Sequence, residues 1–388
     1  MAASAVHQGS NAERSRHRNR LAVLGHIHRA GEMGRAEIAR VLSLSTQAVS
    51  NIIADLQGDG LLLERGRRSV GRGLPAVQYA VNPAGGYALG VEVRTDAVIS
   101  ALVDLQGTVI STMRRNLVDN RPDAVLKTVV KLRDAALSDT PEAKNRMLGA
   151  GVVLPGPVGV TGLAGLGTDL TGWQEVDARA MFAQALELPI EVSNDANAAA
   201  MAEHITGVAQ GFSTYAYLYF GSGLGLGLVS DGHLVQGAFG NAGEIGHIPV
   251  CADGGTLENA LSRLSVQRHL RAKGKEAQDI AALERLYLAR DPDLLQWLAQ
   301  ASLALARAVA IVENLFDPRA IVLGGAMPAP ILDHLIKTTD LPSASVSHRP
   351  DATNPRLIRG ASGPLTATLG AAALVLNKTL SPQLAQAI

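Results

Sequence analysis

Polar side chains with complementary hydrogen-bonding abilities occur in two segments of the chain and could together bind a hydroxylated ligand. Asn194 and Asp195 follow a short apolar run, and Glu244, His247 and Glu258 lie further along the chain. A carboxylate such as Asp195 can accept a proton from a hydroxyl as a general base, although Asp in the first helical turn is equally an ordinary cap. Glu244 and His247 share a face if their turn is helical. Groups that donate and accept suit a polyol; singly, each residue could be a solvated surface group.

A glycine-rich segment, Gly221–Gly227, could form a loop for phosphate. It does not match the dinucleotide fingerprint G-x-G-x-x-G, because Leu226 stands at the last glycine position and a strand follows instead of a helix. We expect a tight turn between two strands. Its backbone N–H groups either cradle a phosphate or simply form a plain hairpin with positive φ.

A second group of polar residues lies at the start of a predicted DNA-reading helix. Apolar residues recur at helical spacing in 20–29, in 35–42 and from residue 46 to about residue 56. Ser45 is a good N-cap for the third of these helices. The opposite face of that helix carries side chains suited to base edges or phosphates: Thr46, Gln47, Ser50 and Asn51.

A basic hairpin follows these helices. Strand-like runs at 61–64 and 76–81 flank a turn at 65–68 and the segment Gly71-Arg72-Gly73. Arg72, between two glycines, can enter a narrow A·T minor groove, and Arg67 and Arg68 lie close enough for phosphate contacts. Helices plus a basic hairpin predict a winged helix-turn-helix. The alternative is a small helical cap that binds no DNA.

The charge distribution agrees with a nucleic-acid-binding head, although the formal net charge of the chain is zero. Residues 1–82 contain 11 arginines, no lysine and 6 acidic residues, a net charge of +5, so the remainder is correspondingly acidic. Chance segregation of charge is the alternative.

Cysteine content and hydropathy exclude several classes of protein. The single cysteine, Cys251, excludes an intramolecular disulfide and a site of three or four cysteines within one chain. A reducing, cytoplasmic compartment is the simplest interpretation, and the arginine-rich N-terminus does not resemble a secretory signal. Polar residues interrupt the longest apolar run, 298–316, so we expect no membrane span: Gln300, Arg307, Glu313 and Asn314.

From Tyr87 onward, short apolar runs alternate with amphipathic segments, which predicts an α/β fold. Two such sheets on either side of a cleft would fit the chain length, and Asp231-Gly232 predicts a hairpin turn. The expected strands are 88–93, 97–104, 108–113, 148–154, 190–192, 214–220, 224–230 and 320–323, and the expected helices are 122–138, 196–204 and 303–316.

Taken together, these segments resemble the ROK family of repressors, open reading frames and sugar kinases, over about residues 15–380. The match is carried mainly by Gly221–His247, with Gly255–Glu258 after it, and by Val192–Ala200. Leu154–Pro157 and Leu323–Gly325 fall in the family's order. The winged head makes the chain similar to the repressor branch, which includes xylose and N-acetylglucosamine repressors.

The resemblance implies an actin-like (sugar kinase/ribonuclease H-like) body of two lobes, with Asp195 at the position of the kinases' catalytic base. Gly221–Gly225 then matches a phosphate loop, and Gly324-Gly325 matches the adenosine region. The implied sugar contacts are Asn194, Asp195, Glu244, His247 and Glu258.

Two departures from the family pattern bear on activity. Kinase members carry Asp-x-Gly-Gly-Thr where this chain has Glu92–Asp96, and Val93 and Arg94 place Cβ atoms where the backbone must approach ATP phosphates. The family's zinc loop, Cys-x-Cys-Gly-x-x-Gly-Cys, is shortened to Cys251–Thr256, with Asp253 and Thr256 at two of the cysteine positions. We expect neither productive ATP binding nor structural zinc, and no other cofactor.

The sequence therefore predicts a winged helix-turn-helix at 1–82 and a sugar-binding body at 83–388. One lobe is expected at about 83–195 together with the C-terminal helix, and the other at about 196–375. The expected function is that of a cytoplasmic, non-enzymatic repressor, a homodimer or homotetramer, whose binding to operator DNA responds to a sugar or sugar phosphate. The alternative is an active ATP-dependent sugar kinase with a DNA-binding extension and Asp195 as its catalytic residue.

Overall fold

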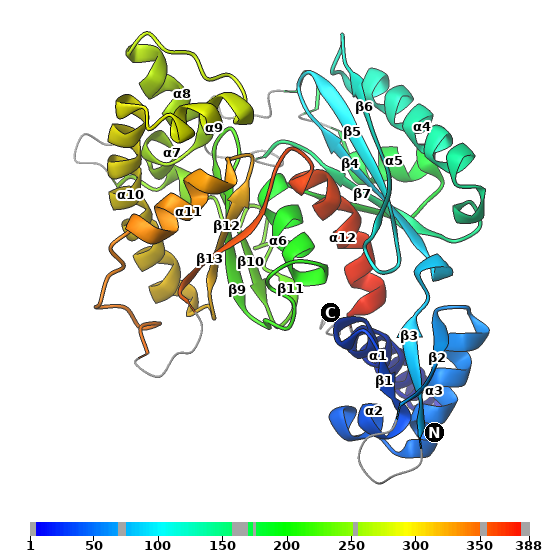
Figure 1. Cartoon of the computed structure of the whole chain (residues 1–388). Coiled ribbons are helices and arrows are strands. Elements are labelled where there is room, and N and C mark those ends of the chain that lie inside the picture. The colour runs from blue at the N-terminus through cyan, green and yellow to red at the C-terminus, as the bar shows by residue number, and fades with distance from the viewer. Residues whose placement is uncertain are drawn as a thin grey trace.

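A computed structural model describes residues 5–68, 75–156, 170–173, 176–250, 255–349 and 355–381 of the chain. Within these ranges a small N-terminal part is joined to a larger part built on two five-stranded sheets (Figure 1). We call the elements up to residue 81 the head and the remainder the body. The α/β class and the two-sheet body predicted from the sequence are confirmed, whereas the domain boundary at residue 82 stays a prediction.

The head consists of helices packed on a small sheet. Ser45 caps the third helix as predicted, because its Oγ accepts a hydrogen bond from the Ala48 N–H at 3.1 Å. Val49, Ile52 and Leu56 of that helix are buried in the head. The elements are α1 (Ala5–Ala30), α2 (Arg35–Leu42), α3 (Thr46–Gly58), β1 (Met33–Gly34), β2 (Leu62–Arg68) and β3 (Ala76–Val81), with sheet order β1-β3-β2.

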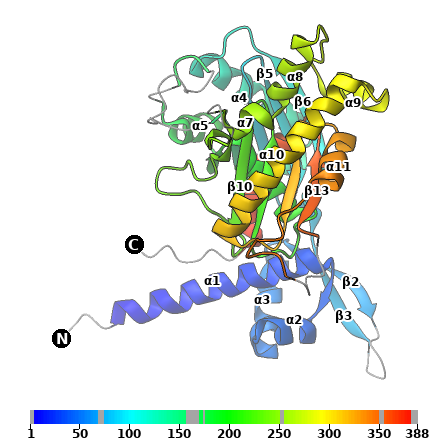
Figure 2. The same ribbon diagram turned by 90° about the vertical axis from the view of Figure 1, so that its left-hand side faces the viewer.

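Two local predictions in the head were wrong. The first helix starts at Ala5 and not at residue 20, and Figure 2 shows its N-terminal part extending beyond α2 and α3. Within the described side chains, Arg16 forms an ion pair with Asp55 of α3, and Arg20 forms one with Asp59, the C-cap of α3. Residues 65–68, predicted as a turn, belong to β2, where an irregularity in the pairing with β3 accommodates them.

The first sheet of the body, which we call the N lobe, has the strand order β6-β5-β4-β7-β8. Strands β4, β5 and β6 pair antiparallel, and β7 and β8 extend the sheet in parallel. Helices α4 and α5 bury their apolar residues against one face. The elements are β4 (Tyr87–Val93), β5 (Ala97–Asp104), β6 (Val109–Asn116), β7 (Met147–Val153), β8 (Ile190–Ser193), α4 (Pro122–Asp139), α5 (Ala178–Leu186), and short helices at Pro83–Gly85 and Pro141–Ala143.

The second sheet, the basis of the C lobe, has the order β11-β10-β9-β12-β13. The predicted Asp231-Gly232 hairpin joins β10 to β11, and both residues have positive φ. The elements are β9 (Tyr215–Phe220), β10 (Leu224–Ser230), β11 (His233–Leu234), β12 (Ile321–Gly325), β13 (Leu357–Ser362), a short helix η3 (Ile245–His247), α7 (Leu257–Ala260), α8 (Arg263–Ala272), α9 (Ile280–Leu288), α10 (Pro292–Phe316) and α11 (Ala329–Thr338).

Helix α10 begins eleven residues before the predicted helix at 303–316 and is long and apolar enough to meet a length-and-hydropathy test for a membrane span. Half of its most apolar window is buried. Its buried residues, among them Trp297, Leu305 and Val312, belong to the core of the C lobe. Its apolar character is therefore that of a core helix.

Helices α6 (Asp195–Ile205) and α12 (Thr366–Leu380) lie side by side between the two sheets (Figure 1). Their backbones approach closely, because a Cβ atom on Gly370 of α12 would overlap the Ala198 carbonyl oxygen of α6. Helix α12 also packs on β4 and β7, and α6 on β9 and β10. The pair thus connects the lobes.

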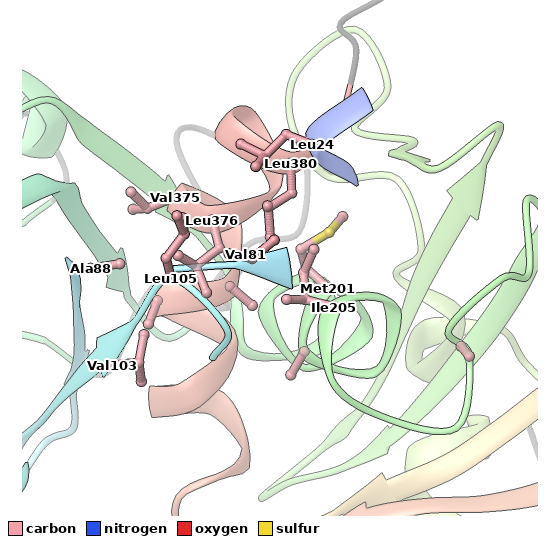
Figure 3. Packing of buried hydrophobic residues seen from close by; sticks show 14 of the residues in the cluster. Leu24, Val81, Ala88, Val103, Leu105, Met201, Ile205, Val375, Leu376 and Leu380 are labelled. Atoms are coloured by element: carbon pink, nitrogen blue, oxygen red, sulfur yellow. The ribbon is translucent and has the colours of Figure 1, made fainter. Parts of the chain in front are cut away.

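The head is docked on the body through the far ends of the same two helices. Figure 3 shows Leu24 of α1 beside Leu380 of α12, with Val81, Leu105 and Ile205 in the same apolar cluster. Hydrogen bonds surround this cluster, including one from the Gln106 side chain to the Val81 carbonyl at 3.1 Å. The head and body therefore share a continuous core.

Candidate functional site

Asn194 and Asp195 lie at the end of β8, where the chain enters α6. Asn194 is the N-cap, and its Oδ1 accepts a hydrogen bond from the Asn197 N–H at 2.9 Å. This leaves its side-chain NH₂ to donate to a ligand. The Oδ1 of Asp195 accepts from the Ala196 N–H at 2.9 Å. The segment therefore caps a helix through Asn194 and places polar groups at its start, whereas the role of Asp195 as a base or sugar contact stays a prediction.

Glu244 and His247 lie at the helical turn η3, as their spacing predicted. The Nε2 atom of His247 is 3.7 Å from Oε2 of Glu244, and both side chains are partly buried. Glu258, in α7, approaches the β9–β10 turn so closely that a Cβ on Gly223 would overlap its Oε2. A Cβ on Gly246, beside His247, would lie 3.3 Å from the same oxygen.

The structure brings these predicted residues together, and glycines make the approach possible. An ideal Cβ on Gly156, after β7, would lie 3.7 Å from the Asn194 Cβ and 3.8 Å from Oε1 of Glu244. One on Gly221 would lie 3.3 Å from Oδ2 of Asp195. The predicted glycine turn is thus the β9–β10 turn and faces the start of α6. We call the group the polar cluster: Asn194, Asp195, Glu244, His247 and Glu258.

Carboxylates in and beside the polar cluster disfavour one another's charge. Burial raises the pKa of Asp195 to about 6, with further contributions from the negative charges of Glu92 and Glu244. Burial also raises the pKa of Glu244. A carboxyl that titrates near neutrality can both donate and accept hydrogen bonds. The cluster is therefore suited to hydroxyl groups.

Three residues next to the cluster were not predicted as site residues: Arg94, Tyr219 and Arg263. Arg94, at the end of β4, donates from Nε to Oε1 of Glu92 at 2.6 Å and from a terminal nitrogen to the Pro364 carbonyl at 2.7 Å. The other Glu92 oxygen accepts from Thr368 Oγ1 at 2.6 Å. In the sequence, Arg94 stood out only because its Cβ would obstruct the approach of the backbone to ATP phosphates. Tyr219 and Arg263 could not be predicted, because their neighbours come from distant parts of the chain.

The predicted DNA-reading residues lie on α3. Thr46, Gln47 and Asn51 are exposed and Ser50 is partly exposed. The Gln47 side-chain NH₂ donates to Oδ1 of Asn51 at 3.1 Å, and Ser50 Oγ donates to the Thr46 carbonyl at 2.9 Å. These pairs hold the side chains on one face of the first two turns, where a recognition helix contacts base edges.

Arg67 and Arg68 are exposed on β2, and a terminal nitrogen of Arg68 lies 4.0 Å from Oε1 of Glu32. Arg72, the predicted minor-groove residue, lies outside the described residues. Cys251 and Asp253 of the shortened loop also lie outside them. Within the described ranges, no group of three or more His, Cys, Asp or Glu side chains could hold a metal ion.

These features define a class of protein: a winged helix-turn-helix joined to a two-lobed, sugar-kinase-like body of the actin fold. The chain belongs to the ROK family, whose model matches residues 88–378. The model of the MarR family matches residues 17–73, which include α2, α3 and β2. Both the predicted family and the predicted fold are therefore confirmed.

Curated relatives cover most of the chain. The xylose repressor of Bacillus subtilis (strain 168) is 25% identical over 315 residues, 79% of this chain and 81% of that protein. A transcriptional regulator of Mycobacterium tuberculosis (strain ATCC 25618 / H37Rv) is 30% identical over 318 residues, 76% of this chain and 71% of that protein.

Solved structures include both regulators and kinases. A ROK family transcriptional regulator, described as a homolog of the E. coli MLC protein, superposes with a TM-score of 0.71 at 23% identity, covering 94% of this chain and 97% of that one. The ROK hexokinase from Thermus thermophilus superposes with a TM-score of 0.57 at 26% identity, covering 74% and 97%. The first likeness concerns the fold alone, and it extends over head and body.

Proposed function

We propose that this chain is a DNA-binding transcriptional repressor whose operator binding is controlled by a sugar or sugar phosphate held by the polar cluster. The observation that carries the proposal is that one continuous core joins the head, whose predicted base-reading residues lie on the surface of α3, to a sugar-kinase-like body. The names of the relatives, a xylose repressor and a transcriptional regulator, support the same conclusion.

On DNA, α3 of each head would enter the major groove, and the hairpin β2–β3 would contact the flanking backbone. A homodimer or homotetramer would present two heads to a pseudo-palindromic operator, whose half-sites lie about one helical turn or a multiple apart. The chain would work in the cytoplasm, without a membrane partner. Binding would weaken steeply with salt, because arginines would displace counterions from phosphates.

The route from ligand to DNA would be helix α6. It begins at Asp195 in the polar cluster and ends at Ile205, which is buried in the same apolar cluster as Leu24 of the head. A ligand that binds one arrangement of the lobes more tightly would favour the corresponding position of α6 and α12. The heads would then be held at a spacing that fits, or does not fit, the two half-sites.

A sugar kinase with a DNA-binding extension is the second candidate function. The pKa of Asp195, about 6, suits a general base, and the body superposes on the Thermus hexokinase. Against activity, Arg94 and Glu92 occupy the strand end with a hydrogen-bonded side-chain pair. A coupled assay of ATP consumption over a panel of sugars distinguishes the two candidate functions. Turnover at enzyme-like rates would reject the proposal that the chain is a repressor without kinase activity.

The repressor proposal is tested with the full chain and a duplex selected from random sequences. Asp195→Ala should abolish the release or tightening of DNA by sugars or their phosphates and leave basal DNA affinity unchanged. Glu276→Ala, on the exposed loop between α8 and α9, is the matched control. If no duplex is selected, the proposal fails. If DNA affinity falls in Asp195→Ala as much as the ligand response does, Asp195 acts structurally.

A further inference from the structure

The turn between β5 and β6, residues 104–108, lies where the N lobe, the head and α6 meet, and we call it the docking turn. Its shape is fixed from within. Oδ1 of the buried Asp104 accepts hydrogen bonds from the N–H groups of Gln106 and Thr108, both at 2.9 Å. Gly107 has a φ of 86°, which glycine adopts at little cost. The docking turn is therefore a well-defined extension of the N-lobe sheet.

The docking turn holds the head through two of its elements. The Gln106 side chain donates to the carbonyl of Val81, the last residue of β3, at 3.1 Å. The Gln106 carbonyl accepts from Nε2 of His28, in α1, at 3.4 Å. Leu105 is buried in the same apolar cluster as Val81 and Leu24 (Figure 3). The head is thus attached to the N lobe at points beyond the chain connection between β3 and β4.

The docking turn also contacts the C-terminal end of α6. Thr206 is the C-cap of this helix, and an ideal Cβ on Gly107 would lie 2.4 Å from its Cγ2. The same Cβ would lie 3.8 Å from Cδ1 of Leu376 in α12. The methyl group of Thr206 therefore packs on the backbone of the turn, where glycine alone leaves room for it. A shift of the end of α6 would displace the docking turn.

The strand that carries the docking turn begins at the ligand end of the N lobe. β5 pairs antiparallel with β4, so it starts where β4 ends. Glu92, near the end of β4, is in register with Val153 of β7, which is in register with Ser193 of β8. Asn194 and Asp195 of the polar cluster follow Ser193 directly. The eight residues of β5 thus span about 25 Å, from the level of the polar cluster to the head.

We propose that the docking turn converts a movement of α6 relative to the N lobe into a movement of the head. A ligand at the polar cluster would shift α6, and Thr206 would then displace Gly107. Because Gln106 is bonded to both β3 and α1, the head would follow the turn. The inference rests on the proposed function and identifies the contact through which α6 acts on the head.

Hydrogen exchange of the full chain, without ligand or DNA, tests the connection between α6 and the head. Thr206→Ser removes the methyl group that packs on Gly107 and keeps the hydroxyl, which donates to the Ala202 carbonyl. Gln106→Met removes the donor to Val81 and keeps the length of the side chain. Both variants leave the residues of α3 and of the polar cluster unaltered.

Gln267→Met is the matched control, because this partly buried glutamine of α8 also donates to a backbone carbonyl, that of Ala277, within the C lobe. We expect the amides of α1 to exchange about fivefold faster in Thr206→Ser and in Gln106→Met, as the loss of one methyl contact or one hydrogen bond provides. They should be unchanged in Gln267→Met. Unchanged exchange of α1 in Thr206→Ser would overturn the proposal, whether or not the chain binds DNA.

The consequence for regulation is measured with xylose, glucose and their phosphates by calorimetry, and with the selected duplex by DNA titration with and without the sugar that binds. Gln106→Met should reduce the effect of the sugar on DNA affinity to less than about twofold, with sugar affinity and sugar-free DNA affinity within about twofold of the unmodified chain. An unchanged sugar effect in Gln106→Met, or an equal loss in Gln267→Met, would overturn the proposal. If no duplex is selected, the repressor proposal fails, and hydrogen exchange still decides whether the docking turn links α6 to the head.

Discussion

Gly25 of α1 lies against Leu380, the last residue of α12, so closely that a side chain on Gly25 would overlap the main-chain carbonyl oxygen of Leu380. The opposite end of α12 carries Thr368, which hydrogen-bonds Glu92 beside Arg94. One helix therefore contacts both the head and Glu92, the carboxylate that also accepts a hydrogen bond from Arg94. Any movement of α12 relative to the sheets would move the surface on which the head rests.

Gly25→Ala should loosen the docking of the head. Adding a methyl group to a packed contact typically costs about 1–3 kcal/mol, because the backbone must shift, and here the shift would separate α1 from α12. We expect a lower urea midpoint and a weaker effect of ligand on DNA binding. The DNA affinity in the absence of ligand should stay unchanged, because the residues of α3 are not altered. Urea unfolding and DNA titrations with and without ligand measure the two effects.

Gly58→Ala is the matched control, since Gly58 also lies in a head helix but has no atom within 4 Å of an added Cβ. Alanine has the higher helix propensity by about 1 kcal/mol, so this variant should be as stable as the original or more stable. Equal stability of the Gly25 and Gly58 variants would contradict close docking of α1 on α12.

Asp195 should make the protein less stable at neutral pH than an asparagine would. Its pKa is raised by burial from 3.8 to about 6, so the native state binds this proton before the unfolded state does as the pH falls. The contribution of Asp195 to the free energy of unfolding therefore increases as the pH falls from about 6 to about 4. Above pH 6 the buried, ionised carboxylate makes the protein about 3 kcal/mol less stable than it is with the carboxyl protonated. Asp195→Asn should raise the stability at pH 7.5, measured by urea unfolding.

His204, at the other end of α6, should have the opposite pH dependence. Burial, the positive charge of Arg29 and the nearby His233 lower its pKa from 6.5 to about 4. The unfolded state therefore binds this proton first, and stability falls by about 3 kcal/mol as the pH decreases from 6.5 to 4. The two effects largely cancel in the unmodified protein.

Single variants should separate these two contributions. As the pH is lowered from 6 to 4, the free energy of unfolding of Asp195→Asn should fall more steeply than that of the unmodified chain. That of His204→Gln should fall less steeply or rise. Only the slopes are compared, because His204→Gln also changes packing. Parallel pH profiles for all three proteins would show that neither group is buried as the structure has it.

Local sequence signals were sufficient for much of this fold. The bounds of α2, the Ser45 cap and the Asp231-Gly232 hairpin follow from residue types within a few positions of each other, and the structure agrees with them. The polar cluster was also predicted, because glycines and polar residues at family spacing mark it. Its assignment to sugar binding stays a prediction.

Contacts between distant segments could not be predicted in the same way. Arg16 and Arg20 pair with Asp55 of α3 and with its C-cap Asp59, and nothing near these arginines in the sequence indicates such partners. The start of α8 lies on the β9–β10 turn, where the Leu264 N–H donates to the Ser222 carbonyl, and these two segments are far apart in the sequence. The Arg94–Glu92 pair was read only as a departure from a kinase motif, because its acceptor at Pro364 lies far away in the chain.

The salt dependence of operator binding should identify the phosphate contacts of the wing, the hairpin formed by β2 and β3. Arg67 and Arg68 are exposed on β2 of the hairpin, and each phosphate contact contributes about −0.9 to the slope of log K against log salt. Arg67→Gln and Arg68→Gln should each make the slope less steep by about one unit and weaken binding to all sequences alike. Arg115→Gln, exposed on β6 of the body, should leave the slope unchanged.

Asn51→Ala should instead lower the affinity for the selected duplex by about 1–3 kcal/mol and relax specificity without changing the slope. An unchanged slope in both wing variants would place the hairpin away from DNA, even if α3 reads the bases.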